Sequence, residues 1–245
     1  MNPLEMFRLE RERNVEAQGT DEELLALSNK WVQRTATYKY SYHFSWLGVP
    51  IIQFPQDMVA MQEVIWSIQP DLIVETGVAH GGSLIFYASM LKLLEGERRV
   101  VGVDIDIRSH NRKAIEDHPM SKHIKLIEGP STDTETVEQV KSYVQQAEKV
   151  LVVLDSNHTH DHVLEELNLY SPMVSKGGYL VVFDTVIEDV PESFSADRPW
   201  GKGNNPKTAV HEFLKSNDRF EVDSQITDKI LVTVAPDGYL KCVKD

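Results

Sequence analysis

Asp71-Leu-Ile-Val-Glu-Thr-Gly-Val-Ala-His-Gly-Gly-Ser83 carries more structural information than any other part of the chain. Its continuous apolar run, Leu72 to Val74, predicts a short buried strand over 71–75. Apolar residues at helical spacing after Ser83 predict a helix over about 82–95. The glycines between them permit positive φ and let a ligand lie against bare backbone. The start of the helix offers unpaired N–H groups to an anion, so we expect a ligand site at this turn.

The spacing of the glycines indicates which ligand is bound. Gly77, Gly81 and Gly82 do not give G-x-G-x-x-G, so the dinucleotide fingerprint lacks its second glycine. An acidic residue followed by G-x-x-x-G-G is instead the pattern of S-adenosylmethionine (SAM) methyltransferases. A second strand, 98–104, ends in Asp104, which could accept hydrogen bonds from two ribose hydroxyls. The alternative is a doubly wound domain with tight turns and a solvated Asp104.

The predicted SAM site draws on several turns at one edge of the sheet. Ser131 follows the third strand and would lie near the adenine, although a simple turn is the other interpretation. The residues expected to line the SAM site are Glu75, Gly77, Ala79, His80, Gly81, Gly82, Ser83, Asp104, Asp106, Ser131 and Asp155.

Composition and charge exclude several classes of protein. The chain has 245 residues, enough for one well-cored α/β domain with an appendage. Its net charge of −13 and lack of a Lys/Arg cluster argue against nucleic acid as the main partner. Cys242 is the only cysteine, which excludes a disulfide within the chain and a cysteine-based zinc site. No apolar signal core and no run of membrane-spanning length stand out, so we expect a cytoplasmic protein.

Strands and helices alternate from residue 55 onward, which predicts a doubly wound, Rossmann-like α/β fold with a mostly parallel, seven-stranded sheet. We expect a methyltransferase domain over 55–245 and an N-terminal helical and aromatic arm over 1–54. Aromatic residues alternate through 38–46, either packing in an extended segment or forming a lip over the substrate. The expected strands are 71–75, 98–104, 123–128, 149–155 and 178–184, followed by an antiparallel edge hairpin of 219–225 and 229–235. The expected helices are 55–68, 82–95, 108–118, 133–147, 160–174 and 206–217.

Four of the predicted strands end in an acid: Glu75, Asp104, Asp155 and Asp184. Carboxylates gathered on one edge of a sheet are costly without a cation or hydrogen-bond donors. Asp155 and Asp184 end neighbouring central strands and could share a metal ion, for which oxygen ligands favour Mg²⁺, Mn²⁺ or Ca²⁺. The alternative is that they only cap the turns that follow.

Histidine is dense directly after Asp155. His158, three residues on, is the expected general base, because a neutral imidazole can take a proton from a substrate hydroxyl. His160 and His162 are expected in the first turn of the next helix, facing solvent or neighbouring side chains. The long loop before residue 206 is either disordered or a lid over the substrate. The residues of this loop expected to contact substrate are Arg198, Trp200, Asn204 and Asn205.

From about Tyr42 to Val234 the chain resembles the family that groups rhamnosyl O-methyltransferases with cephalosporin-hydroxylase-associated proteins. The matching segments are Val74-Glu-Thr-Gly-Val-Ala-His-Gly-Gly-Ser83, Gly102-Val-Asp-Ile-Asp106, Asp155-Ser-Asn-His158, Gly177-Gly-Tyr-Leu-Val-Val-Phe-Asp184 and Arg198-Pro-Trp-Gly…Asn-Asn-Pro206. The family is similar to Mg²⁺-dependent macrolide-sugar O-methyltransferases. That resemblance implies a class I SAM methyltransferase fold, metal binding by Asp155 and Asp184, and a base at His158.

The sequence departs from this pattern at the end of the fifth strand. An acidic pair is common there, but Phe183 precedes Asp184 in this chain. One metal ligand is therefore absent or is supplied by another residue, such as Thr185 or Asp189.

The expected function is transfer of a methyl group from SAM to a sugar hydroxyl of a glycoside, glycolipid or secondary metabolite, with Mg²⁺. Two alternatives remain open. One is a hydroxylase, for which Asp155, His158 and His160 could be forced into an iron-binding set. The other is a non-catalytic SAM-binding partner subunit. The acceptor and the oligomeric state stay open, and the N-terminal arm could exchange between subunits of a homo-oligomer.

Overall fold

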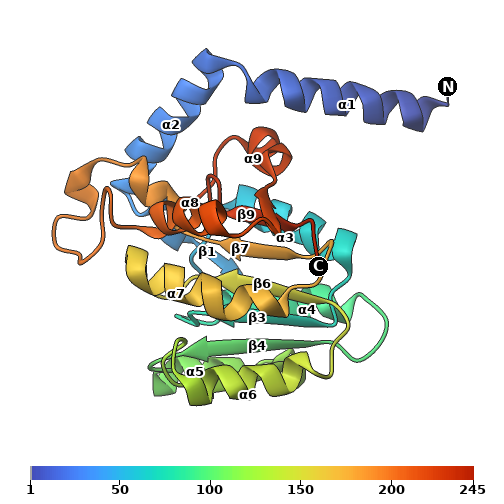
Figure 1. Ribbon diagram of the computed structural model, residues 1–245, viewed down its shortest axis with the longest axis vertical. Coiled ribbons are helices and arrows are strands. Elements are labelled where there is room, and N and C mark those ends of the chain that lie inside the picture. The colour runs from blue at the N-terminus through green and yellow to red at the C-terminus, as the bar shows by residue number, and fades with distance from the viewer. Residues whose placement is uncertain (1) are drawn as a thin grey trace.

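The computed structural model describes residues 2–245, so Met1 of the expected arm lies outside the described residues. Its centre is a seven-stranded sheet in the order β5-β4-β3-β6-β7-β9-β8 (Figure 1). The strands are β3 (Leu72–Thr76), β4 (Arg99–Asp104), β5 (Ile124–Glu128), β6 (Val150–Leu154), β7 (Tyr179–Val182), β8 (Phe220–Val222) and β9 (Tyr239–Cys242). The first five are parallel, and β9 runs antiparallel to both β7 and β8. The predicted doubly wound, mostly parallel sheet is confirmed.

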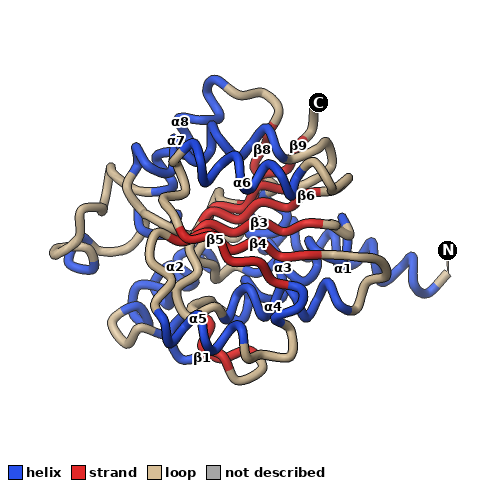
Figure 2. The backbone as a smooth tube through the Cα atoms, turned by 90° about the horizontal axis from the view of Figure 1, so that it is seen from below, coloured by secondary structure: helices blue, strands red, loops and turns tan. Residues whose placement is uncertain are grey.

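Helices cover both faces of the sheet because the strand residues are apolar on both sides. In β3, Ile73 packs into one apolar cluster, whereas Leu72 and Val74 pack into another. Helices α3 (Pro55–Ile68), α4 (Gly82–Lys92) and α5 (Ser109–Glu116) lie on the first face. Helices α6 (Thr134–Val144), α7 (His160–Tyr170) and α8 (Pro206–Ser216) lie on the second (Figure 2). Because successive side chains of each strand point to opposite faces, the sheet lies as a middle layer between two layers of helices.

Short 3₁₀ helices complete several connections between these elements. They are η2 (Ser121–His123), η3 (Ser171–Met173), η4 (Thr185–Glu188) and η5 (Glu192–Phe194).

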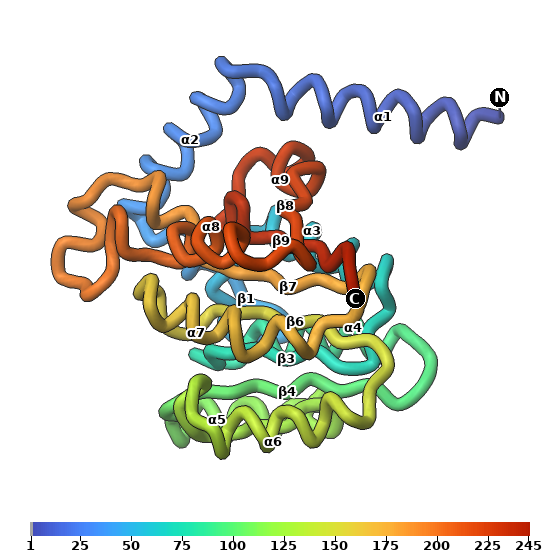
Figure 3. Tube along the Cα trace, viewed as in Figure 1, coloured from blue at the N-terminus to red at the C-terminus, as the bar shows by residue number. Residues whose placement is uncertain are grey.

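The N-terminal arm begins with α1 (Pro3–Gly19), which projects away from the sheet, and continues with α2 (Glu22–Ala36) (Figure 3). The aromatic segment forms η1 (Tyr40–His43) and then β1 (Phe44–Trp46), which pairs with β2 (Val49–Ile51) as a two-stranded hairpin. The Tyr40 ring lies edge-on to the rings of Trp31 and Phe54, with centroids 4.9 and 5.5 Å away. These contacts support packing for part of the aromatic segment, whereas Tyr38 and Tyr42 are exposed. No helix within residues 2–245 has both the length and the apolar character needed to cross a membrane.

The expected edge hairpin is wrong in its second strand. Residues 229–235 do not pair with 219–225; instead α9 (Ser224–Ile230) follows β8, and β9 supplies the partner strand. The segment between α9 and β9 uses its polar groups elsewhere, because Thr233 Oγ1 and the Val234 N–H donate hydrogen bonds to the buried Asp57. Tyr239 and Leu240 are fully buried, so burial favours β9 as the strand that lies between β7 and the edge strand β8.

Candidate functional site

The glycine turn lies directly against the end of β6. Gly77 has φ +90°, and a Cβ added there would lie 2.6 Å from the carbonyl carbon of Asp155 and closer still to its oxygen. Only glycine combines this backbone angle with so close an approach. Gly81, at φ +86°, is the N-cap of α4 and provides no capping side chain, so the first N–H groups of this helix stay open to a ligand.

Asp104 shapes this turn from the neighbouring strand. One carboxylate oxygen accepts a hydrogen bond from the Val78 N–H at 2.8 Å, and the other accepts from the Asp106 N–H at 3.1 Å. Asp104 is therefore not simply solvated, and it holds the turn from the tip of β4. A carboxylate has about four acceptor positions, so this arrangement leaves room for the predicted ribose contact. Ala79 and Asp106 are exposed beside it.

Glu75 is fully buried beneath the turn. Its Oε2 accepts a hydrogen bond from the Ser83 hydroxyl at 2.6 Å. Burial raises the pKa of Glu75 to about 8. Hydrogen bonds from the Ser83 and Tyr87 hydroxyls lower this pKa and so offset part of the effect of burial.

The remaining predicted SAM-site residues have neighbours within the protein. His80 Nδ1 lies 3.4 Å from Asn111 Oδ1. Ser131 is buried, and its hydroxyl lies 3.1 Å from Nε2 of His162, whose pKa is raised by the hydrogen bond to Glu166. His162 thus faces neighbouring side chains, as expected, and links the turn after β5 to α7.

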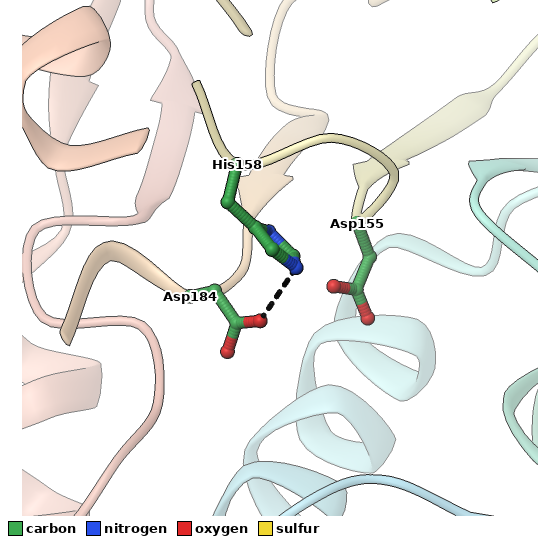
Figure 4. A group of neighbouring side chains, drawn as sticks. All are labelled: Asp155, His158 and Asp184. Carbon is green, nitrogen blue, oxygen red and sulfur yellow. Dashed lines mark ion pairs between the residues drawn. The ribbon is translucent and has the colours of Figure 1, made fainter. Parts of the chain in front are cut away.

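Asp155, His158 and Asp184 converge where β6 and β7 end (Figure 4). His158 Nε2 lies 3.2 Å from Asp184 Oδ2, and the three residues each offer one ligand atom within 4.8 Å of the others. Asp184 adopts φ +56°, which turns the chain at this point. Burial raises the pKa of Asp155 well above its ordinary value, and the nearby Asp184 charge adds to this effect. A cation between the two carboxylates would offset both the burial of the Asp155 charge and its repulsion by Asp184. The donor chemistry of the two aspartates therefore fits a metal ion.

The structure does not support Thr185 as the missing metal ligand, which corrects that expectation. Thr185 is fully buried, and its hydroxyl donates to the carbonyl oxygen of Pro236 at 2.6 Å. Asp189 is likewise engaged, because Lys207 Nζ lies 2.8 Å from its carboxylate. The third group that the structure brings to the two aspartates is His158. The Asp-x-x-His spacing indicated this nearness to the two aspartates.

His160 lies outside this group. Its Nδ1 lies 2.8 Å from Thr208 Oγ1 and its Nε2 lies 3.2 Å from Glu212, so the ring ties α7 to α8. A set of two histidines and one carboxylate is therefore not assembled at Asp155 in the described residues.

The loop before α8 lies over the group formed by Asp155, His158 and Asp184. The Trp200 ring contacts the His158 ring edge-on at 5.3 Å, and the Arg198 guanidinium lies 5.7 Å from the same indole. Trp200 is half-buried and Arg198 is exposed, so both are placed where a substrate could contact them.

The two asparagines of this loop have structural hydrogen bonds. Asn204 Oδ1 accepts from the His160 N–H at 2.9 Å, but the residue stays exposed. Asn205 is fully buried and caps α8, accepting from the N–H groups of Lys207 and Thr208. The expected substrate contact by Asn205 is therefore wrong for this structure, because its side chain is occupied and inaccessible. The Asn-Pro pair before an apolar helix was the signal for this cap.

Comparison with known proteins adds the decisive observation: the family model described as Rhamnosyl O-methyltransferase/CmcI matches residues 38–243. The chain belongs to this family. The rhamnosyl O-methyltransferase of Mycobacterium tuberculosis strain H37Rv is 30% identical over 200 residues, which is 80% of this chain and 77% of the relative. That of Mycobacterium leprae is 32% identical over 148 residues, covering 60% and 62%. The predicted family resemblance is confirmed.

Solved structures show the same fold. An apo structure of CmcI has a TM-score of 0.59 at 19% identity, and CmcI with Mg and SAM has 0.57 at 18%, each over 83% of this chain and 78% of the other. An O-methyltransferase from Bacillus cereus in complex with SAH has 0.52 at 14%, over 89% and 90%. At these identities the likeness establishes the class I methyltransferase fold of this family member.

Proposed function

We propose that the protein is a SAM-dependent O-methyltransferase that methylates a sugar hydroxyl and uses Mg²⁺. The observation that carries the proposal is the convergence of Asp155, His158 and Asp184 at the strand ends that also present the glycine turn. The family relatives are named rhamnosyl O-methyltransferases, so a rhamnosyl group is the first acceptor to test. A structural neighbour described with Mg and SAM supports the two cofactors.

The described residues fit a bound SAM. The open N–H groups at the start of α4 suit the carboxylate of its methionyl group. Asp104 keeps acceptor positions for ribose hydroxyls. Ser131 would lie toward the adenine.

For Mg²⁺, the fitting ligands are the carboxylates of Asp155 and Asp184, because this ion prefers oxygen and usually keeps several waters. An imidazole is a poorer ligand for it, which leaves His158 free to hold a proton. When bound, the two groups would supply an electrophilic methyl on a sulfonium sulfur and a charge that lowers the pKa of an acceptor hydroxyl.

The remaining chemistry belongs to the protein. The His158 imidazole would take the hydroxyl proton while the acceptor oxygen gains the methyl group, and the sulfonium sulfur would keep the electron pair of the broken carbon–sulfur bond. Asp184, 3.2 Å from Nε2, stabilises the imidazolium that forms. Trp200 restricts the orientation of the imidazole and helps to exclude water.

The proposal is tested by methyl transfer from SAM to an aryl rhamnoside with Mg²⁺ and after chelation, together with calorimetry of S-adenosylhomocysteine (SAH) binding. We expect metal-dependent transfer, and a loss of roughly 10²–10³-fold in Asp155→Asn with SAH affinity retained. Asp189→Asn is the matched control, because that carboxylate pairs with Lys207 and should leave the metal dependence unchanged. Iron- and 2-oxoglutarate-dependent oxidation would contradict the proposal, as would SAH binding without transfer to any sugar acceptor.

A further inference from the structure

The N-terminal hairpin, β1 and β2, lies against the glycine turn of the proposed SAM site. A Cβ added to Gly82 would lie 2.6 Å from the Pro50 carbonyl carbon and 2.8 Å from the Ile51 Cα. Trp46 Nε1 also donates a hydrogen bond of 2.9 Å to Ser89 Oγ on α4. The chain after β2 is therefore held over the start of α4, although it precedes the parallel strands in sequence.

A small hollow remains between this segment and the turn. Residues 50–53, residues 77–83 and Asp155 line it, and its volume is about 40 Å³. The hollow therefore has room for a small polar group of a few atoms, such as a carboxylate or an ammonium, beside the start of α4.

Gln53 is a polar residue of this lining whose side-chain oxygen is buried and unpaired. It is only 4% exposed, and its Oε1 is buried without a hydrogen bond to any described residue. Leaving such an atom unpaired costs free energy comparable to a lost hydrogen bond. Asp57, four residues further on and equally buried, accepts hydrogen bonds from Thr233, Val234 and Tyr239. Among the described residues that line the hollow, Gln53 alone has a buried side-chain oxygen without a hydrogen-bond partner.

We propose that Gln53 binds the amino-acid end of SAM, an inference that rests on the proposed function. A carboxamide offers both a donor and an acceptor, which match the carboxylate and the ammonium of a methionyl group. The start of α4 presents further N–H groups to the carboxylate. Ser83, which also lines the hollow, donates its hydroxyl hydrogen bond to Glu75 beneath the turn. Gln53 therefore acts as a cofactor-binding residue that the N-terminal arm contributes to the sheet.

Two ligands that differ only at this end test the inference. SAH carries the amino-acid group, and 5′-methylthioadenosine has the same nucleoside and a sulfur but lacks that group. In Gln53→Met we expect the dissociation constant for SAH to rise roughly 10- to 100-fold, as for loss of hydrogen bonds to charged groups, and that for methylthioadenosine to stay unchanged. Gln53→Ala gives a second measurement that does not depend on how the methionine packs.

Gln56→Met is the matched control. Gln56 Oε1 is also buried without a partner, but the residue does not line the hollow, so both affinities should stay at the wild-type value. Unfolding of the ligand-free proteins adds a separate readout, since replacing an unpaired amide by Met should not lower stability.

The outcomes separate the two proposals. Unchanged SAH binding in both Gln53 variants overturns the role of Gln53 and leaves the proposed function standing. Equal weakening of both ligands overturns it as well, because the defect would then not be confined to the amino-acid end. If the wild-type protein binds neither ligand, the proposed function itself fails.

Discussion

Gly77→Ala is the substitution that tests most directly how the glycine turn supports the position of Asp155, one of the proposed metal ligands. The new Cβ would lie 2.6 Å from the carbonyl carbon of Asp155 and 3.1 Å from the Cα of Ser156. Both are backbone atoms, so no side chain can rotate away to make room. The end of β6 must move, and it carries the Asp155 carboxylate with it.

Two free-energy terms contribute to the expected loss of stability. An alanine at φ +90° is strained by about 1–2 kcal/mol. Forcing an extra methyl group into a packed site adds about 1–3 kcal/mol. We therefore expect Gly77→Ala to lower the free energy of unfolding by about 2–5 kcal/mol. A displacement of Asp155 on the order of 1 Å should also reduce turnover about 10²-fold.

Urea unfolding of Gly77→Ala and Gly96→Ala separates the two terms. Gly96 has φ +93° but no heavy atom within 4 Å of an added Cβ, so its variant reports the backbone strain alone. Methyl transfer as a function of Mg²⁺ concentration then reports the position of Asp155. Equal destabilisation of the two variants, with wild-type turnover in Gly77→Ala, would refute the reasoning.

Three further predictions follow from single residues. His158→Ala should lower turnover by roughly 10²–10⁴-fold while calorimetry shows nearly unchanged SAH affinity; normal turnover would remove its role as base. Burial raises the pKa of Asp57 from 3.8 to about 6, so this carboxyl group binds more protons in the folded state than in the unfolded state. Its contribution to the free energy of unfolding, about 3 kcal/mol, is therefore full below pH 3.8 and is lost as the pH rises through 6. Stability in Asp57→Asn, measured by urea unfolding from pH 4 to 7, should lack this dependence; an unchanged slope would contradict the assignment. Asn205→Ala should lower stability by about 1–2 kcal/mol through loss of the α8 cap; a raised KM for the acceptor without destabilisation would restore its expected substrate role.

The parallel part of the fold was predictable because each strand is a continuous apolar run bounded by turn residues. The expected α3, 55–68, agrees with Pro55–Ile68 to the residue, since Pro at its start and the apolar spacing define both ends. The edge hairpin was not predictable in the same way. Within α9, Ile226 is the one residue that is buried, so the apolar pattern gives little signal for this helix. The path of the following residues depends on Asp57, far away in sequence, which accepts hydrogen bonds from Thr233 and Val234.

The residues of the candidate site also fall into a predictable set and an unpredictable set. Asp155, His158 and Asp184 could be placed together from sequence because they follow neighbouring strands whose ends share one edge. Thr185 and Asn205 were misassigned, because sequence does not show which way a loop side chain turns. Thr185 turns inward to Pro236, and Asn205 turns inward to the start of α8.

The N-terminal arm shows why a boundary drawn at 54/55, where the alternating strand and helix pattern begins, does not separate structure from function. Val49, Ile51 and Phe54 belong to the same apolar cluster as α3 and α4, so the hairpin is part of the core. Its backbone closes over Gly82, which has no Cβ to prevent the approach. A chain beginning at residue 55 would expose this cluster and open the hollow that Gln53 lines. Because the same contacts bury the hairpin and shape the hollow, the arm stabilises the fold and completes the proposed cofactor site through one interface.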